Sequence, residues 1–173
     1  MRRMVEPEIL DGLPAEDPEA VRSRRDLRRI NVLMGNLAWM QRAMRQLPAG
    51  CARRLVEIGA GEGELLERVR DDFESVRGVD LAPRPAGLSA EIGWIQGDVF
   101  EHLGEGDLLM ANLFLHHFED GRLRQLGERM QEFKALCFSE PRRSRWAILE
   151  GYALVPFVNR VTRHDMMVSV RAG

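Results

Sequence analysis

The pattern of apolar and polar residues predicts strands and helices that alternate along most of the chain. Short apolar runs bordered by turn residues have the length of buried strands. Between and before these runs, apolar residues recur at the three- and four-residue spacing that is typical of amphipathic helices. The pattern therefore predicts an α/β fold with a mainly parallel sheet. The predicted strands cover residues 53–58, 75–80, 92–96, 107–112 and 135–138.

A glycine-rich turn follows the first predicted strand. The segment from Leu55 to Gly63 reads LVEIGAGEG, with glycine at every second position from Gly59. Glycine suits this turn because side chains would block a ligand from the backbone amides and because such a turn usually requires a positive φ. Residues 62–70 then continue as an amphipathic helix whose positive end faces the loop.

The spacing of the loop separates two classes of cofactor. Dinucleotide-binding proteins have G-x-G-x-x-G with the pyrophosphate on the helix N-terminus, but here Glu64 stands in the third place. The segment instead reads E-x-G-x-G-x-G and resembles motif I of the class I S-adenosylmethionine-dependent methyltransferases. A dinucleotide site and a structural glycine turn are the alternatives. The resemblance implies that the methionine part is held by Glu57, Gly59, Ala60, Gly61 and Gly63.

Acids after the next two strands fit the same resemblance. Asp80 follows Gly59 by 21 residues, close to the spacing at which nucleotide-binding folds place a carboxylate on the ribose hydroxyls. Leu81 would then lie against the adenine. The resemblance implies that Asp98 accepts the adenine amine and that Val99 offers a backbone amide. A helix N-cap or turn acid at Asp80, and a simple turn at Asp98, are the alternatives.

The fourth strand leads into a run of polar and aromatic residues. Ligands bind beyond the carboxyl ends of strands in such sheets, so Asn112 to His117 should lie beside the glycine loop. Many small-molecule methyltransferases carry a similar L-H-H-h-x-D run. We expect the two neighbouring histidines to point in different directions. We expect no metal site, since neither histidine has a ligand partner at helical or hairpin spacing.

The first 48 residues are predicted to form an arm and a helical lid, and residues 49–173 the core. Residues 1–18 contain three prolines and several acids, so they are expected to be loosely ordered or laid over a neighbour. A helix should begin at Asp17, a suitable N-cap. In the resembling family such helices often shape the acceptor pocket. Asn31, Asn36 and Trp39 would then face the substrate, and plain packing is the alternative.

The C-terminal region supplies the candidates for a catalytic base. A helix is predicted from Pro141, with Trp146, Leu149 and Ala153 facing inward. The polar cluster 159–165 should lie on a connection that returns over the pocket. His164, next to Asp165, is the first candidate for a general base and His117 the second. A structural hydrogen bond is the alternative role for His164.

The resemblance has a narrower form and one departure. The cluster 159–165, the DLRRIN run and LHHF together resemble a subgroup of methyltransferases often encoded beside type III polyketide synthases. Class I methyltransferases have a Rossmann-like, doubly wound sheet, which implies strand order 3-2-1-4-5 here. They normally end in two further strands that this sequence lacks. The core is therefore expected to be C-terminally incomplete, with its last strand exposed unless a homodimer or other sequence covers it.

Composition excludes several function classes. The chain is 45% hydrophobic and 30% charged, with a net charge of −2 and a pI near 6.1, so nothing indicates nucleic-acid binding by charge. No apolar run suggests a signal peptide or a membrane span. Cys51 and Cys137 are too few for a disulfide framework, which fits a cytoplasmic protein.

The sequence thus predicts a cytoplasmic methyltransferase (EC 2.1.1 class) that uses S-adenosyl-L-methionine. The acceptor should be a hydroxyl or an activated carbon of a small, aromatic or hydrophobic molecule. The alternatives are a protein that binds S-adenosylmethionine without turnover, and a NAD(P)-binding oxidoreductase, which Glu64 disfavours.

Overall fold

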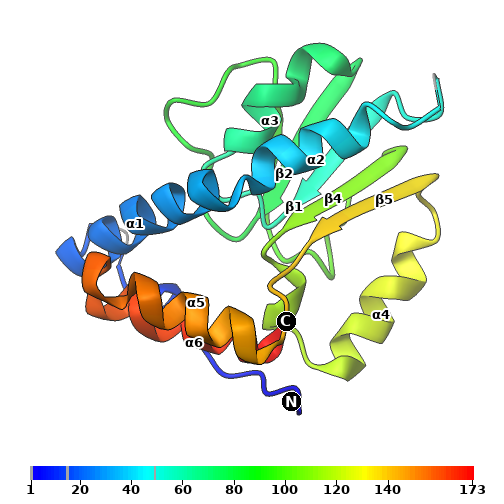
Figure 1. Cartoon of the computed structure of the whole chain (residues 1–173). Coiled ribbons are helices and arrows are strands. Elements are labelled where there is room, and N and C mark those ends of the chain that lie inside the picture. The colour runs from blue at the N-terminus through cyan, green and yellow to red at the C-terminus, as the bar shows by residue number, and fades with distance from the viewer. Residues whose placement is uncertain (1, 15, 49) are drawn as a thin grey trace. The chain divides into compact units, whose positions relative to one another are not determined.

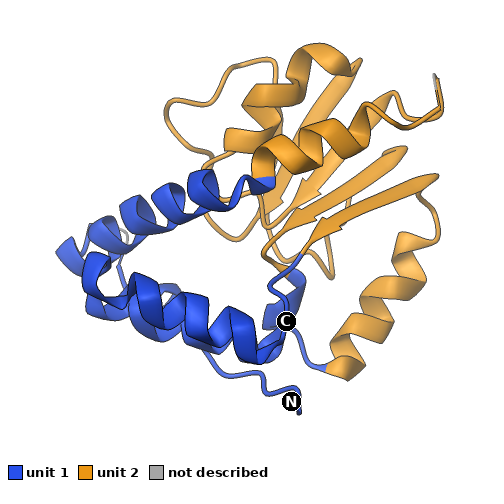
Figure 2. Cartoon of the chain, viewed as in Figure 1, with its two compact units in different colours: residues 1–36, 115–119, 140–173 blue, residues 37–114, 120–139 orange. Residues whose placement is uncertain are grey.

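The computed structural model describes residues 2–14, 16–48 and 50–173 (Figure 1). The chain divides into two compact units (Figure 2). Unit 1 is formed by the first 36 residues together with 115–119 and 140–173, and unit 2 by residues 37–114 and 120–139. Each unit is a separate set of contacts.

Unit 2 is built on a five-stranded parallel sheet with the order β3-β2-β1-β4-β5. This confirms the predicted Rossmann-like α/β fold and its strand order. The observed strand ends differ from the predicted ones by at most one residue, because each strand is a short apolar run with turn residues on both sides. The strands are β1 (Arg54–Ile58), β2 (Ser75–Asp80), β3 (Gly93–Gln96), β4 (Leu108–Asn112) and β5 (Ala135–Ser139).

Helices cover both faces of this sheet. They are α2 (Asn36–Met44), α3 (Glu64–Val69) with the 3-10 turn η2 (Arg70–Asp72), and α4 (Asp120–Met130). The connections β1–α3–β2 and β4–α4–β5 step in opposite directions from the centre, so right-handed crossovers put α3 and α4 on opposite faces. The α2 side chains Leu37, Met40 and Met44 are buried in the same apolar cluster as those of α3. Trp39 on α2 is instead 52% exposed.

One carboxylate ties together the amino ends of three strands. Asp107 precedes β4, and its Oδ2 accepts the backbone N–H groups of Arg53 at 3.0 Å and Arg54 at 2.9 Å. Its Oδ1 lies 2.9 Å from the Lys134 ammonium, just before β5. The contact with Lys134 and the two amide hydrogen bonds hold the pKa of Asp107 well below its usual range.

Unit 1 is helical and contains both ends of the described chain. Asp17 caps α1 as predicted, accepting the amide of Glu19 at 2.8 Å, and Gly35 ends the helix in the left-handed conformation. Asp26 is buried in α1 and accepts the amide of Asn159, which caps α6. The elements are η1 (Leu10–Gly12), α1 (Pro18–Met34), η3 (Leu115–His117), α5 (Arg145–Leu154), η4 (Val155–Phe157) and α6 (Arg160–Ala172).

Two expectations for the C-terminal region are wrong. The residues of the cluster 159–165 are not a loop, because Asn159 caps α6 and the rest form its first turns. In α5, Trp146 is 75% and Leu149 58% exposed, and Ala153 is exposed too. The apolar residues of α5 lie on more than one side, so the spacing alone did not identify its buried side.

The N-terminal arm is fixed to other parts of unit 1. Arg3 donates hydrogen bonds to the carbonyl oxygens of Ala172 at 2.7 Å and Phe118 at 2.6 Å. The amides of Ile9 and Leu10 both donate to the buried Asp165 carboxylate. Of the two expected states of the arm, its described part therefore adopts the one in which it is laid over a neighbouring segment.

No helix in the described part of the chain combines the length and the apolar character that crossing a membrane requires.

Asp107→Ala should lower the melting temperature at neutral pH. The substitution leaves two strand amides and an ammonium without their shared acceptor. A lowered carboxyl pKa stabilises the fold above the ordinary value of 3.8 and ceases to do so as pH falls through the folded value. The difference from the wild type should therefore shrink on acidification below about pH 4, as measured by circular dichroism. Asp71→Ala, at a side chain 89% exposed, is the matched control and should change little.

Candidate functional site

The predicted cofactor residues of unit 2 meet at the carboxyl ends of the strands. The loop after β1 turns through three glycines with positive φ, 64° at Gly59, 54° at Gly61 and 71° at Gly63. A Cβ at Gly59 would lie 2.1 Å from the Phe114 ring, and one at Gly63 would lie 2.5 Å from Leu88. A Cβ at Gly61 would meet nothing within 4 Å. The loop is thus packed at both ends and open in the middle, where a ligand could approach its backbone.

Asp80 ends β2 beside this loop. One carboxylate oxygen accepts the amide of Gly61 and the other that of Ala82, both at 2.8 Å. These bonds fix the carboxylate at the rim of the open part of the loop. Leu81 follows with a side chain that is 74% exposed. An exposed leucine beside a fixed carboxylate offers an apolar surface and an acceptor to the same ligand.

Glu57 is the most unusual group of the site. It lies in the central strand β1, only 3% exposed. Its Oε2 has no hydrogen-bond partner among the residues that the structure describes, and the same holds for Oδ1 of Asn112 at the end of β4. Burial, with a smaller contribution from the charge of Asp80, raises the pKa of Glu57 to about 8. A buried carboxyl group with an unpartnered oxygen fits a cationic or hydrogen-donating ligand group, which would favour its ionised form.

The remaining predicted cofactor residues are placed as follows. Asp98 follows β3 in a turn, where its Oδ1 accepts the amide of Phe100 at 2.9 Å and its Oδ2 lies 3.7 Å from Arg122. The side chains of Val99 and Ala60 are buried, so these residues could reach a ligand only through their backbones. The hydrogen bond expected between Asp98 and the adenine amine stays a prediction. One oxygen of Asp98 already accepts an amide of its own turn.

The two candidate bases belong to unit 1. Nδ1 of His164 lies 3.0 Å from Oδ1 of Asp165, on the first turns of α6. The His164 side chain is 45% exposed, whereas that of Asp165 is 1% exposed. Because Asp165 is fixed by two arm amides, it can orient the imidazole and leave Nε2 for a proton.

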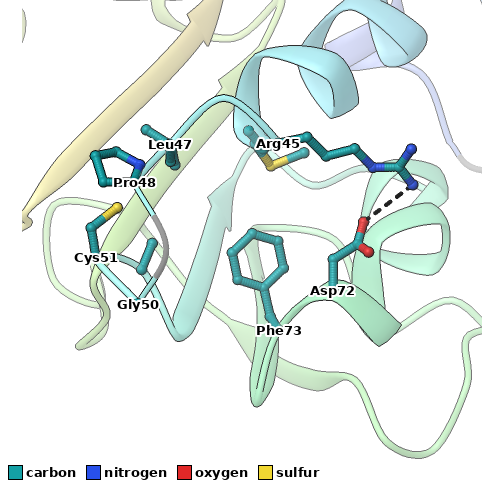
Figure 3. Close-up of a pocket in the computed structure, with 9 residues that line it drawn as sticks. Arg45, Leu47, Pro48, Gly50, Cys51, Asp72 and Phe73 are labelled. Atoms are coloured by element: carbon teal, nitrogen blue, oxygen red, sulfur yellow. Dashed lines mark ion pairs between the residues drawn. The ribbon is translucent and has the colours of Figure 1, made fainter.

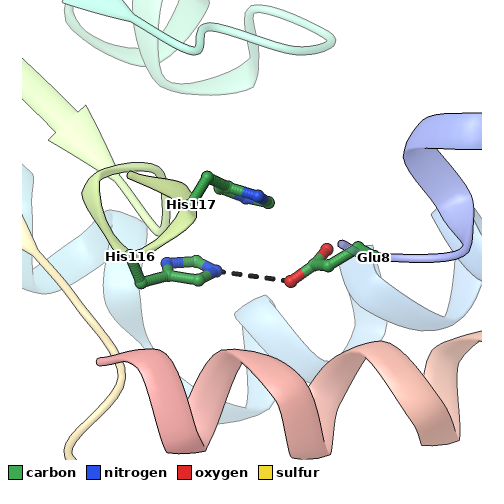
Figure 4. Close-up of side chains that lie close together, drawn as sticks. All are labelled: Glu8, His116 and His117. Carbon is green, nitrogen blue, oxygen red and sulfur yellow. Dashed lines mark hydrogen bonds and ion pairs between the residues drawn. The ribbon is translucent and has the colours of Figure 1, made fainter. Parts of the chain in front are cut away.

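His117 belongs to a cluster that sequence reasoning did not find. His116 and His117 form η3, and their ring centroids are 4.3 Å apart with planes tilted by only 31°. The expectation that neighbouring histidines point in different directions is therefore wrong, because the 3-10 turn and the side-chain torsions bring the rings together. Both rings lie beside Glu8 of the arm (Figure 4). A contact between residues 8 and 116 leaves no spacing signal, so no sequence pattern could have identified it.

Carboxylates surround the buried His116 ring. Nδ1 lies 2.8 Å from Oε2 of Glu140, and Nε2 lies 3.4 Å from Oε1 of Glu8. Burial alone would lower the pKa of His116, but the hydrogen bonds to Glu140 and Glu8 outweigh burial and raise the pKa to about 9. Asp11 lies 3.6 Å from His117. Burial raises the pKa of Asp11, although the charge of His117 opposes this effect.

A pocket of about 250 Å³ lies at the amino end of the sheet (Figure 3). Arg45 and Asp72 form an ion pair at 3.6 Å on one wall, and Phe73 and Cys51 line other parts. The lining residues precede β1 and β2, whereas the glycine loop follows β1. This pocket is therefore separate from the cofactor residues.

Comparison with solved structures identifies the fold of the chain. The plantazolicin methyltransferase BpumL in complex with SAH matches over 91% of this chain and 65% of its own length, with a TM-score of 0.69 and 18% identity. Human N-acetylserotonin methyltransferase in complex with SAM matches over 94% of this chain and 55% of its own, with a TM-score of 0.53 and 20% identity. The chain has the class I methyltransferase fold. It spans less than two thirds of the length of either protein.

A bacterial methyltransferase domain has this methyltransferase fold as well. That of CtHen1 matches over 62% of this chain and 66% of its own, with a TM-score of 0.51 and 20% identity. No protein-family model matches the sequence, and no curated protein does. The likeness to these proteins is therefore one of fold alone.

Glu57→Gln should change how stability depends on pH. Between the ordinary pKa of 4.5 and the folded value of about 8, folded Glu57 keeps a proton that the unfolded chain has lost. Stability should therefore fall with rising pH across this window, by at most ~1.4 kcal/mol per pH unit. Urea unfolding from pH 5 to 8 should show a flatter slope for Glu57→Gln. Equal slopes for wild type and variant would contradict the raised pKa; Glu62→Gln, exposed in the same loop, should keep the wild-type slope.

Proposed function

We propose that this chain is an S-adenosylmethionine-dependent methyltransferase that methylates a small molecule. The observation that carries the proposal is the buried, unpartnered carboxylate of Glu57, followed at once by an open glycine loop with Asp80 at its rim. The class I methyltransferase fold supports it. A dinucleotide fits less well, because Glu64 opens α3 where a pyrophosphate would need positive charge.

Each site residue has a role in this proposal. Glu57 accepts hydrogen bonds from the α-ammonium group of the methionine part, and the glycine loop lets that part lie against the backbone. Asp80 binds the ribose hydroxyls through its two carboxylate oxygens, each of which also accepts one backbone amide. Leu81 packs on the adenine, while Asp98 and the Val99 amide bind its edge. Asn112 lies at the end of β4, where its unpartnered oxygen accepts a donor from the cofactor.

The chemistry requires alignment and the removal of a proton. When bound, S-adenosylmethionine supplies an electrophilic methyl group for an in-line displacement at carbon. A hydroxyl or an activated carbon of the acceptor must lose a proton, and a positioned base typically contributes ~10²- to 10⁴-fold to the rate. His164 is our first candidate because Asp165 holds its Nδ1 side, and His117 is the second.

The acceptor is proposed to be aromatic or hydrophobic. Apolar residues follow β4, among them Phe114, which covers Gly59 in unit 2.

The partner proposed for the sheet edge is a second copy of this chain. In the described part of the chain β5 pairs only with β4, and Leu136 on β5 is 48% exposed. An unpaired parallel edge of this kind is open to strand pairing.

Titration with S-adenosylhomocysteine should distinguish the proposal from a nicotinamide oxidoreductase. Calorimetry should show one site for S-adenosylhomocysteine and none for NAD. Asp80→Ala should weaken binding at least tenfold, because the ribose loses its charged acceptor and the glycine loop loses the bond to Gly61. Asp71→Ala should bind as the wild type does. Binding of NAD alone, or no loss in Asp80→Ala, would contradict the assignment.

A second test separates an enzyme from a protein that only binds the cofactor. Methyl transfer from labelled S-adenosylmethionine to a panel of phenols and 1,3-dicarbonyl compounds should detect turnover. With an accepted substrate, His164→Gln should lower kcat by ~10²- to 10⁴-fold and leave the affinity for S-adenosylhomocysteine unchanged. A chain that binds S-adenosylhomocysteine but methylates none of these compounds would favour binding without turnover, and full activity in His164→Gln would exclude that base.

A further inference from the structure

Three potential metal ligands converge inside unit 1. They are a carboxylate oxygen of Glu8 and one ring nitrogen each from His116 and His117, all within 4.8 Å of one another. Figure 4 shows the His116 ring directed at the Glu8 carboxylate, with the His117 ring lying over it. The side chains of His116 and Glu8 are 4% and 10% exposed, whereas that of His117 is 25% exposed. The group is thus buried on one side and reachable from the other.

The ring nitrogen of His116 that faces away from Glu8 has the partner that is usual in metal sites. This nitrogen, Nδ1, is hydrogen-bonded to Oε2 of Glu140, and the other oxygen of Glu140 accepts the amide of Leu115 at 2.7 Å. A metal-bound histidine usually donates its second ring N–H to a carboxylate, which fixes the ring and directs the other nitrogen at the ion. Asp11 lies 3.6 Å from Nδ1 of His117, which is an ion-pair distance and too long for a hydrogen bond. The hydrogen-bonded carboxylate that is usual behind a metal ligand is therefore present at His116.

The contact between Nε2 of His116 and the Glu8 carboxylate requires a cation between the two groups. With Nδ1–H donated to Glu140, the Nε2 lone pair faces the Glu8 carboxylate, which also only accepts. Either a proton or a metal ion must lie between them. The 3.4 Å separation is longer than the ~2.7–2.9 Å of a charge-assisted hydrogen bond. It matches the ~3.3–3.4 Å between two ligands of a tetrahedral zinc ion with bonds of ~2.0–2.1 Å.

We propose that Glu8, His116 and His117 bind a divalent transition-metal ion of the zinc type, with one position open. Two histidines and one carboxylate form a donor set found in three-ligand zinc sites. The ion would fix the arm at residue 8 onto η3 and so stabilise unit 1. The expectation of no metal site rested on local spacing alone, and the third ligand comes from 108 residues earlier in the chain. This proposal does not depend on the methyltransferase function, but it leaves His164 as the candidate base, because a metal-bound nitrogen of His117 cannot also accept a proton.

The test is a titration of the untagged full chain, stripped with a chelator, with Zn²⁺ and with Co²⁺. Calorimetry should give one ion per chain, and bound Co²⁺ should give the visible absorption of a tetrahedral site. Glu8→Gln and His117→Asn should each weaken Zn²⁺ binding more than about 100-fold, since they remove a ligand. Glu140→Gln should weaken it ~10–100-fold, because it removes only the carboxylate behind His116. Zn²⁺ should also raise the melting temperature of the wild type but not of Glu8→Gln.

Matched controls keep the result unambiguous. His102→Asn removes a histidine of unit 2 that is 52% exposed, and it should bind Zn²⁺ as the wild type does. Glu8→Gln retains an oxygen for the Ser169 hydroxyl, so its circular dichroism in chelator should match that of the wild type. Absence of Zn²⁺ binding, or equal affinity in wild type, Glu8→Gln and His117→Asn, would overturn the proposal. A wild-type chain that binds S-adenosylhomocysteine but no Zn²⁺ would overturn this proposal and leave the proposed function intact.

Discussion

All five strands of unit 2 run in the same direction, and every feature of the proposed cofactor site depends on that constraint. Parallel strands present their carboxyl ends along one edge, so residues that follow β1, β2 and β4 are neighbours in space although they lie far apart in the chain. The same arrangement places Glu57 in the central strand, where the sheet and its helices exclude water from the carboxylate. At the amino ends of the strands, Asp107 connects the starts of β1, β4 and β5 through hydrogen bonds and an ion pair.

Much of unit 2 could be predicted because its signals are local. An apolar run of five residues between turns is enough to indicate a buried strand, and a glycine triplet at alternate positions is enough to indicate a left-handed loop. The 21-residue interval from Gly59 to Asp80 also follows from the length of one helix and one strand. The burial of Glu57 and its raised pKa were not predicted, because both depend on the strands and helices that surround β1.

Unit 1 could be predicted only in part, because its contacts join distant segments. The Asp17 cap was predicted from its residue type, but the partners of Glu8, Asp26 and Asp165 were not. Each of these acids is satisfied by a segment more than 100 residues away, for which periodicity holds no information. The buried side of α5 could not be predicted for a related reason. Hydrophobic spacing shows where apolar residues lie on a helix, but not which of them another element covers.

The way the arm is held has a consequence for the order in which the chain folds. Unit 2 is made from a nearly continuous stretch, residues 37–139 apart from 115–119. The arm, in contrast, forms its bonds with residues 165–172, and the bond from Arg3 to Ala172 closes a separation of 169 residues. During synthesis on a ribosome the arm must therefore remain without these partners until residues 165–172 have been made, while the sheet can already assemble. The arm is made before the sheet but reaches its place after it.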